Sequence, residues 1–123
     1  MKVGLIGAGK MGLGLAQNMM RHGHEVVVLT RSELRVTMLR EAGVEAFALT
    51  EAFLEKLDSP KIIWMMVPAG DAVDDTIDLL LPDLKKGDIL IDGGNSHFED
   101  SISRAAFLAS REIHYLDVGT SGG

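Results

Sequence analysis

The sequence predicts an α/β fold: a doubly wound, mostly parallel sheet with helices on both faces. Three observations indicate this class. Short apolar runs alternate with helix-like segments, the connections are short, and a glycine-rich turn joins the first run to the first helix. Six strands in this alternation suit the strand order 3-2-1-4-5-6. The 123 residues are enough for one domain with a single well-packed core.

Three strands and two helices are expected in the first half of the chain. The β-branched run of the second strand is typical of a buried parallel strand, and a glycine follows each helix, where it favours termination. Ser32 is a plausible N-cap. The expected elements are a strand at Val3–Ile6, a helix at Lys10–Arg21, a strand at Glu25–Leu29, a helix from Ser32 to Glu41 and a weak strand at Val44–Phe47.

Three further strands and three helices are expected in the second half. Thr50 is placed as an N-cap, Ser59-Pro60 as a break, and Pro82 as the end of a helix. The expected elements are a helix at Thr50–Leu57, a strand at Lys61–Val67, a helix at Asp71–Leu81, a strand at Asp88–Asp92, a helix at Phe98–Ser110 and a strand at Ile113–Asp117. Asp74, Asp75 and Asp78 are expected to form a solvated helix face.

Composition excludes several classes of function. Twelve basic and eighteen acidic residues give a net charge of −6, which disfavours nucleic-acid binding. The chain has no cysteine, so thiol catalysis and cysteine metal sites are excluded; its four histidines show no ligand spacing, and no metal site is expected. The apolar runs are too short or too interrupted to span a membrane. A chain without disulfides suits the cytoplasm.

A glycine-rich turn is the strongest functional motif. Gly7-Ala8-Gly9-Lys10-Met11-Gly12 matches GxGxxG directly after the first strand and at the start of the first helix. In a Rossmann-type fold the first glycine allows a tight turn, the second lets a pyrophosphate approach, and the third lets helix and strand pack closely. The pyrophosphate would lie at the helix N-terminus, which favours negative charge. The alternative is a purely structural turn.

The end of the second strand indicates NADP, with NAD as the less favoured cofactor. NAD-binding domains usually carry an acid here for the ribose hydroxyls, but the sequence has Thr30-Arg31-Ser32 and no acid between Val26 and Ser32. Without a carboxylate a 2′-phosphate is not repelled, and a guanidinium can hold it with paired hydrogen bonds. The alternative is a solvated Arg31 and a Ser32 that serves only as a cap.

Two further strand ends are candidate ligand loops, because ligands of such sheets bind beyond the carboxyl ends of the strands. Met66-Val67-Pro68-Ala69-Gly70 follows the fourth strand and would pass beside the adenosine ribose. Asp92-Gly93-Gly94-Asn95-Ser96 follows the fifth strand; its glycines would let the chain approach a ligand, and Asn95 offers both a donor and an acceptor. The residues alone fit equally well a plain strand end, a turn and a helix cap at Ser96.

These motifs, followed by Asp117-Val118-Gly119-Thr120-Ser121-Gly122-Gly123, resemble in order those of the 6-phosphogluconate dehydrogenases, within the β-hydroxyacid dehydrogenase superfamily. The resemblance spans the whole chain, and the run from Asp92 to Ser96 is its most specific part. It implies that the pyrophosphate is bound by Gly7, Ala8, Gly9, Lys10, Met11 and Gly12, and that the 2′-phosphate ribose is held by Thr30, Arg31 and Ser32. It implies that the adenosine side is formed by Met66, Val67, Pro68 and Ala69. It also implies that Asn95 contacts nicotinamide and substrate, and that the substrate pocket begins at Ser121, Gly122 and Gly123. Thr30 stands where NADP-dependent members commonly have Asn.

The resemblance also implies an activity and partners. Members oxidise the 3-hydroxyl of a phosphorylated sugar acid, 6-phosphogluconate, by hydride transfer to NADP and decarboxylate the product to ribulose 5-phosphate, in the pentose phosphate pathway and gluconate utilization. Their general base, a lysine, and general acid, a glutamate, would lie beyond Gly123. They form homodimers through a C-terminal helical domain.

We therefore expect residues 1–123 to be a cofactor-binding fragment that lacks the helical domain, has no catalytic residue of its own and does not turn over substrate. The alternatives are another member of the superfamily, such as a 3-hydroxyisobutyrate dehydrogenase or an imine reductase, and a non-catalytic NADP-sensing module.

Overall fold

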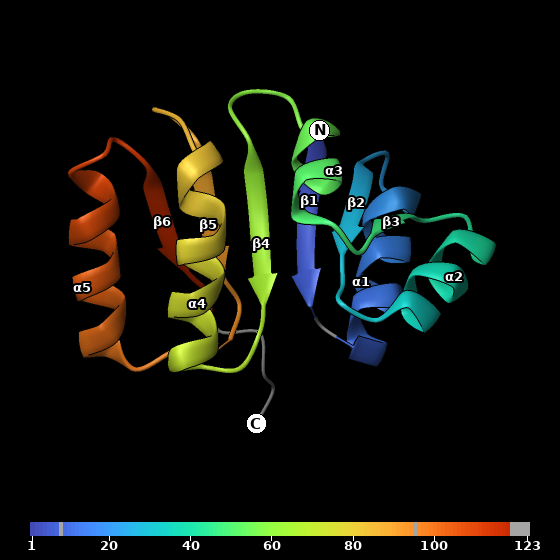
Figure 1. The fold of residues 1–123 in the computed structure, drawn as a ribbon, viewed down its shortest axis with the longest axis horizontal. Helices are drawn as coiled ribbons and strands as arrows, with labels where there is room; N and C mark the ends of the chain where they lie inside the picture. The colour runs from blue at the N-terminus through green and yellow to red at the C-terminus, as the bar shows by residue number, and fades with distance from the viewer. Residues whose placement is uncertain (8, 95, 119–123) are drawn as a thin grey trace.

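The computed structural model describes residues 1–7, 9–94 and 96–118, which form one six-stranded parallel sheet. The strand order is β3-β2-β1-β4-β5-β6, as the sequence predicts. Since every neighbouring pair is parallel, the carboxyl ends of all the strands lie along one edge of the sheet (Figure 1). The strands are β1 Lys2–Gly7, β2 Glu25–Leu29, β3 Glu45–Phe47, β4 Ile62–Met66, β5 Ile89–Asp92 and β6 His114–Asp117.

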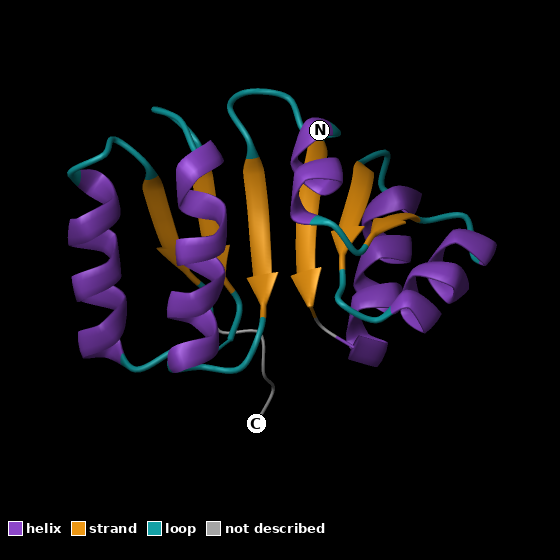
Figure 2. Ribbon diagram, viewed as in Figure 1, coloured by secondary structure: helices purple, strands orange, loops and turns teal. Residues whose placement is uncertain are grey.

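Helices cover both faces of the sheet, and Figure 2 shows α4 and α5 in front of it. The helices are α1 Gly9–Arg21, α2 Glu33–Glu41, α3 Thr50–Glu55, α4 Asp71–Leu80 and α5 Phe98–Ala109. One face is covered by α3, α4 and α5, through buried side chains such as Phe53, Ile77 and Leu108. The other face is covered by α1 and α2, through Ala16 and Leu39. Within the described residues, no helix is long and apolar enough to cross a membrane.

The central strand is β1, which pairs with β2 on one side and with β4 on the other. Its side chains alternate between the two cores: Leu5 packs toward α1 and α2, and Ile6 toward α3, α4 and α5. A Cβ on Gly4 would lie 2.6 Å from the ring of Phe53. The missing side chain therefore lets α3 pack directly on the middle of the sheet.

Helix ends differ from the prediction by one or two residues, as at Glu55, where α3 ends two residues before Leu57. Two predicted helix signals also act differently in the structure. Thr50 is the first residue of α3; the N-cap position is Leu49, which makes no side-chain cap bond. Pro82 does not end the helical path, because it lies within a 3₁₀ turn, Leu81–Asp83, that directly follows α4. Proline is tolerated there because the first turn of a helix does not need its amide donor.

A buried carboxylate joins β4 and β5 at the amino edge of the sheet. Asp88 is fully buried and accepts hydrogen bonds from the amides of Lys61 and Lys85, both at 2.8 Å. The ammonium of Lys61 lies 4.0 Å from the same carboxylate. Asp88 therefore fixes the chain just before both strands, at the end of the sheet opposite the ligand loops.

Candidate functional site

Three loops come into backbone contact at the carboxyl edge, where β1, β4 and β5 end. Gly7 has a φ of +82°, and a Cβ on it would lie 2.7 Å from the carbonyl oxygen of Met66. A Cβ on Gly94 would overlap the carbonyl oxygen of Val67. Only glycine fits at both positions, because the neighbouring atoms are backbone atoms that cannot rotate away. We call Gly7, Met66, Val67 and Gly94 the glycine junction.

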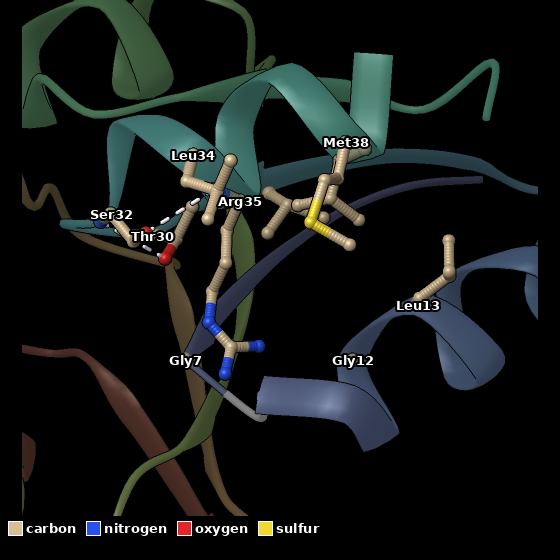
Figure 3. A pocket seen from close by; sticks show the side chains of 10 residues that line it. Gly7, Gly12, Leu13, Thr30, Ser32, Leu34, Arg35 and Met38 are labelled. Atoms are coloured by element: carbon tan, nitrogen blue, oxygen red, sulfur yellow. Dashed lines mark hydrogen bonds between the residues drawn. The ribbon is translucent and has the colours of Figure 1, made fainter. Parts of the chain in front are cut away.

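A pocket of about 300 Å³ opens beside Gly7, between α1 and α2 (Figure 3). We call it the α1–α2 pocket. Its lining combines aliphatic side chains with hydroxyl groups and one guanidinium. It is lined by Gly7, Gly12, Leu13, Val28, Thr30, Ser32, Leu34, Arg35, Met38 and Leu39. The start of α1, whose first turn carries no acidic residue, lies at its edge.

A second hollow, of about 430 Å³, is lined by residues of α4 and we call it the α4 pocket. It shares Gly7 and Thr30 with the α1–α2 pocket, so the two hollows meet at the ends of β1 and β2. Its lining is Ile6, Gly7, Leu29, Thr30, Arg31, Ala48, Thr50, Val67, Pro68, Ala72, Asp75, Thr76 and Leu79. The α1–α2 and α4 pockets flank the point where the strand order reverses, which is where ligands bind in doubly wound sheets.

The three residues predicted in the turn after β2, Thr30, Arg31 and Ser32, do not all line the same pocket. The hydroxyl oxygen of Ser32 caps α2 by accepting a hydrogen bond from the amide of Arg35 at 3.2 Å, and Thr30 accepts one from the amide of Ser32 at 3.4 Å. Ser32 is thus a cap and also lines the α1–α2 pocket, where its hydroxyl can still donate. The exposed Arg31 lines the α4 pocket instead.

Arg35 also lines the α1–α2 pocket, and the sequence alone did not single it out. It extends from the first turn of α2 across the α1–α2 pocket toward Gly7, as Figure 3 shows. The side chain is exposed and ends beside the glycine-rich turn. Its position in the sequence could have indicated this. Arg35 comes three residues after the helix cap Ser32, and a side chain at that position of a helix points back over the end of the preceding strand, β2.

The loop after β5 is organised by a buried carboxylate. Asp92 is fully buried and accepts hydrogen bonds from the amide of Gly94 at 2.8 Å, from the hydroxyl of Ser96, and from the phenol of Tyr115 at 2.5 Å. Burial, with the hydrogen bond to this carboxylate, raises the pKa of Tyr115 well above its ordinary value, while Arg104 acts in the opposite direction. The phenol therefore remains a donor to Asp92 at neutral pH.

A buried arginine lies behind the same loop. Arg104 donates from Nε to Asp74 Oδ1 at 2.8 Å and from Nη2 to Asp74 Oδ2 at 3.2 Å, and its Nη1 lies 3.8 Å from Asp92 Oδ2. The paired hydrogen bonds lower the pKa of Asp74 below its ordinary value. The predicted solvated face is confirmed, since Asp74, Asp75 and Asp78 are exposed. The prediction missed that the carboxylate of Asp74 also holds the buried guanidinium.

The floor beneath the loop is made by two side chains of β4. A Cβ on Gly93 would lie 2.5 Å from Met66 Sδ and would overlap Trp64 Nε1. Trp64 is the single tryptophan of the chain. The loop therefore lies directly on Trp64, which places an optical reporter under it.

Comparison with known proteins identifies this arrangement. A sequence model described as the NAD binding domain of 6-phosphogluconate dehydrogenase matches residues 2–123. The chain belongs to this family. It is a dinucleotide-binding domain of the 6-phosphogluconate dehydrogenase type.

Individual relatives agree with the family match. The chain is 45% identical over its whole length to an NAD(+)-dependent, decarboxylating 6-phosphogluconate dehydrogenase of Haloferax volcanii, and spans 40% of that relative. The solved 6-phosphogluconate dehydrogenase of Plasmodium falciparum, described with its cofactor NADP+ and its substrate 6-phosphogluconate, superposes on the whole chain with a TM-score of 0.90 at 31% identity. The chain covers 28% of that structure.

A 3-hydroxyisobutyrate dehydrogenase of Mycobacterium tuberculosis has the same fold, with a TM-score of 0.84 over 99% of the chain and 41% of that structure. At 22% identity this likeness shows the fold alone.

The predicted site residues of this 6-phosphogluconate dehydrogenase domain converge where they are described. Gly7 and Gly12 line the α1–α2 pocket, Val67 and Pro68 line the α4 pocket, and Ala69 is exposed on the same loop. The half-buried Met66 packs on the side of α1 and α2.

Other predicted residues lie outside the described part of the chain. These are Ala8, Asn95, Ser121, Gly122 and Gly123, together with the side chains of Lys10 and Met11. Within the described residues, no group of three His, Asp or Glu side chains is arranged to hold a metal ion.

Proposed function

We propose that the chain is the NADP-binding domain of a decarboxylating 6-phosphogluconate dehydrogenase. The observation that carries this proposal is the pair of adjoining pockets at the carboxyl edge, which meet at Gly7 and contain two arginines but no acid at the end of β2. The family match and the NADP+ described for the Plasmodium falciparum relative support it.

Each part of the dinucleotide has a place in this arrangement. The pyrophosphate would lie along Gly7 and the start of α1, where amide groups and the helix dipole favour negative charge. The adenine would occupy the α4 pocket between Arg31 and the aliphatic part of α4, because a planar ring stacks well on a guanidinium. Ser32 and Arg35 would hold the 2′-phosphate from the α1–α2 pocket.

The nicotinamide would lie near the loop after β5. Asn95 would contact nicotinamide and substrate, and Ser121, Gly122 and Gly123 would begin the pocket for the phosphorylated sugar acid. A bound dinucleotide would supply the hydride acceptor there. In the whole protein a lysine beyond Gly123 would remove the proton of the 3-hydroxyl. Loss of the carboxylate as CO₂ would follow, and a glutamate beyond Gly123 would protonate the resulting enol.

We propose a homodimer in the cytoplasm that acts in the pentose phosphate pathway or in gluconate utilization. Residues 1–123 would bind the cofactor and orient its nicotinamide. They would not complete turnover alone, because proton transfer depends on groups beyond Gly123.

The coenzyme preference can be tested by titrating the chain with NADP+ and with NAD+ at equal ionic strength. We expect tighter NADP+ binding, because Arg31, Ser32 and Arg35 offer cationic and hydroxyl donors to a 2′-phosphate. Arg35→Ala should weaken NADP+ by about 10- to 100-fold and leave NAD+ nearly unchanged. Arg31→Ala should weaken both nucleotides, because it removes the stack on the shared adenine, and should weaken NADP+ more than NAD+.

Arg21→Ala is the matched control, because Arg21 is in the last turn of α1, at the other end of that helix from the glycine-rich turn. It should change neither affinity. Equal binding of both nucleotides, with no effect of the two site substitutions, would instead assign the chain to an NAD-dependent protein, as the Haloferax volcanii relative is named.

A further inference from the structure

One guanidinium connects the loops that follow β4 and β5. Arg104 projects from α5 and is only 7% exposed. Its Nη2 donates to the carbonyl oxygen of Gly70 at 3.1 Å, at the end of the β4 loop. Its Nη1 faces the carboxylate of Asp92, at the start of the β5 loop, across 3.8 Å. The position of Arg104 therefore sets the distance between the two loops.

The carboxylate of Asp92 also holds the tip of the β5 loop, so the position of Arg104 affects the position of that tip. Its Oδ1 accepts from the amide of Gly94, and its Oδ2 accepts from the hydroxyl of Ser96. Asn95 lies between these two residues in the sequence. Gly94 also packs on the carbonyl of Val67, so the β4 and β5 loops touch directly at the glycine junction.

Neither of the two charged groups of this network lines the pockets assigned to the adenosine half. The linings of the α1–α2 and α4 pockets include neither Asp92 nor Arg104. A loss of this network should therefore affect one half of the dinucleotide and spare the other.

We propose that Arg104, acting through Asp92 and the Gly70 carbonyl, is a positioning residue that orients the β5 loop toward the nicotinamide half of the bound dinucleotide. This inference rests on the proposed function, because it assumes that a nicotinamide dinucleotide is the ligand. Arg104 itself does not touch the ligand. It acts by holding the backbone on both sides of Asn95 at a fixed height above Trp64.

The test compares two ligands on the full chain: NADPH, and adenosine 2′,5′-bisphosphate, which lacks the nicotinamide. Trp64 is the single tryptophan, so energy transfer from it to the reduced nicotinamide reports the position of that ring. In Arg104→Met and Asp92→Asn we expect adenosine bisphosphate to bind within about twofold of wild type. NADPH should bind at least about tenfold more weakly and show reduced energy transfer at saturation.

Two further variants separate positioning from folding. Ser101→Ala is the matched control, because Ser101 is also buried on α5 but donates to Asp117 at 2.7 Å and not to Asp92. It should retain wild-type binding of both ligands. Arg104→Lys should restore part of the energy transfer, since an ammonium can keep the charge but cannot reach both loops with fixed geometry.

The possible failures are distinguishable. If both ligands weaken equally in Arg104→Met and Asp92→Asn, the network is only structural and the inference is wrong. Unchanged NADPH binding and energy transfer in both variants would also overturn it. If the wild-type chain binds neither ligand, the proposed function fails, and the inference fails with it.

Discussion

At the scale of single residues, the glycine junction depends on which atoms surround each α-carbon. Gly7 and Gly23 have similar left-handed backbones, with φ of +82° and +86°. A Cβ on Gly7 would meet the carbonyl of Met66, whereas a Cβ on Gly23 would meet nothing within 4 Å. The two positions therefore separate the cost of the backbone conformation from the cost of close contact.

We predict different losses of stability for the two alanine substitutions. Gly23→Ala should lower the free energy of unfolding by about 1 kcal/mol, since only the left-handed conformation is penalised. Gly7→Ala should lower it by about 2–4 kcal/mol, because β1 and β4 must also move apart. Urea denaturation of both variants measures the difference, and equal losses would show that the junction is not tightly packed.

The sequence predicted which strand ends would form the candidate site, but it did not predict the side-chain contacts within it. The residues Gly7, Gly12, Thr30 and Ser32 line one pocket, because both motifs follow directly after strands that end at the same edge of the sheet. Arg35, Arg104 and the Asp74 pairing were missed. Arginine and aspartate on helices are typical of solvent-exposed faces, and the partners of Arg104 come from another helix and another strand.

At the scale of secondary-structure elements, Asp88 is the main polar link between β4 and β5. Its carboxylate is fully buried, and its hydrogen bonds to two backbone amides and its ion pair with Lys61 compensate for that burial. The sequence placed Asp88 at the start of a strand but gave no reason to expect burial, because its partners are brought together only by the finished sheet.

Asp88→Asn should destabilise the chain by about 2–4 kcal/mol, because the amide cannot accept both hydrogen bonds and leaves the Lys61 ammonium without its counter-charge. Thermal or urea unfolding gives this value. Asp58→Asn, at an exposed position in the connection between α3 and β4, should change stability by no more than about 0.5 kcal/mol. Similar effects of the two substitutions would contradict the assignment of Asp88 as a buried link.

The elements themselves could be predicted to within a few residues. Runs such as Val26-Val27-Val28 are buried on both faces and so lack polar alternation, which is why parallel strands stand out in a sequence. The end of α4 and the start of α3 were less certain, because proline and threonine are each accepted at more than one helix position.

At the scale of the whole molecule, the ion pair between Asp74 and Arg104 makes stability depend on pH. The pKa of Asp74 is lower in the folded chain than in the unfolded chain, because Arg104 binds the ionised carboxylate. The contribution of the pair is therefore complete above the unfolded value of about 3.9, and it is lost as the pH falls through the lower folded value.

We predict that Asp74→Asn lowers the free energy of unfolding by about 1 kcal/mol at pH 7, a modest value because the carboxylate is partly exposed. The difference from wild type should shrink below a pH of about 4. Urea denaturation across the acid range measures it. Asp78→Asn, which removes an exposed carboxylate from the same helix, should show no such convergence; a pH-independent Asp74 effect would exclude the ion pair as its cause.

The central position of β1 has a consequence for how the chain folds. Lys2–Gly7 is made first, and its two neighbours follow at very different times: Lys2 pairs with Glu25, but Gly4 pairs with Ile63. During synthesis one edge of this apolar strand stays open after the other has closed, and an open edge invites pairing with another chain. The second edge of β1 is covered only when Ile62–Met66 docks, so the second half of the chain protects the first strand as it brings the loops of the glycine junction together.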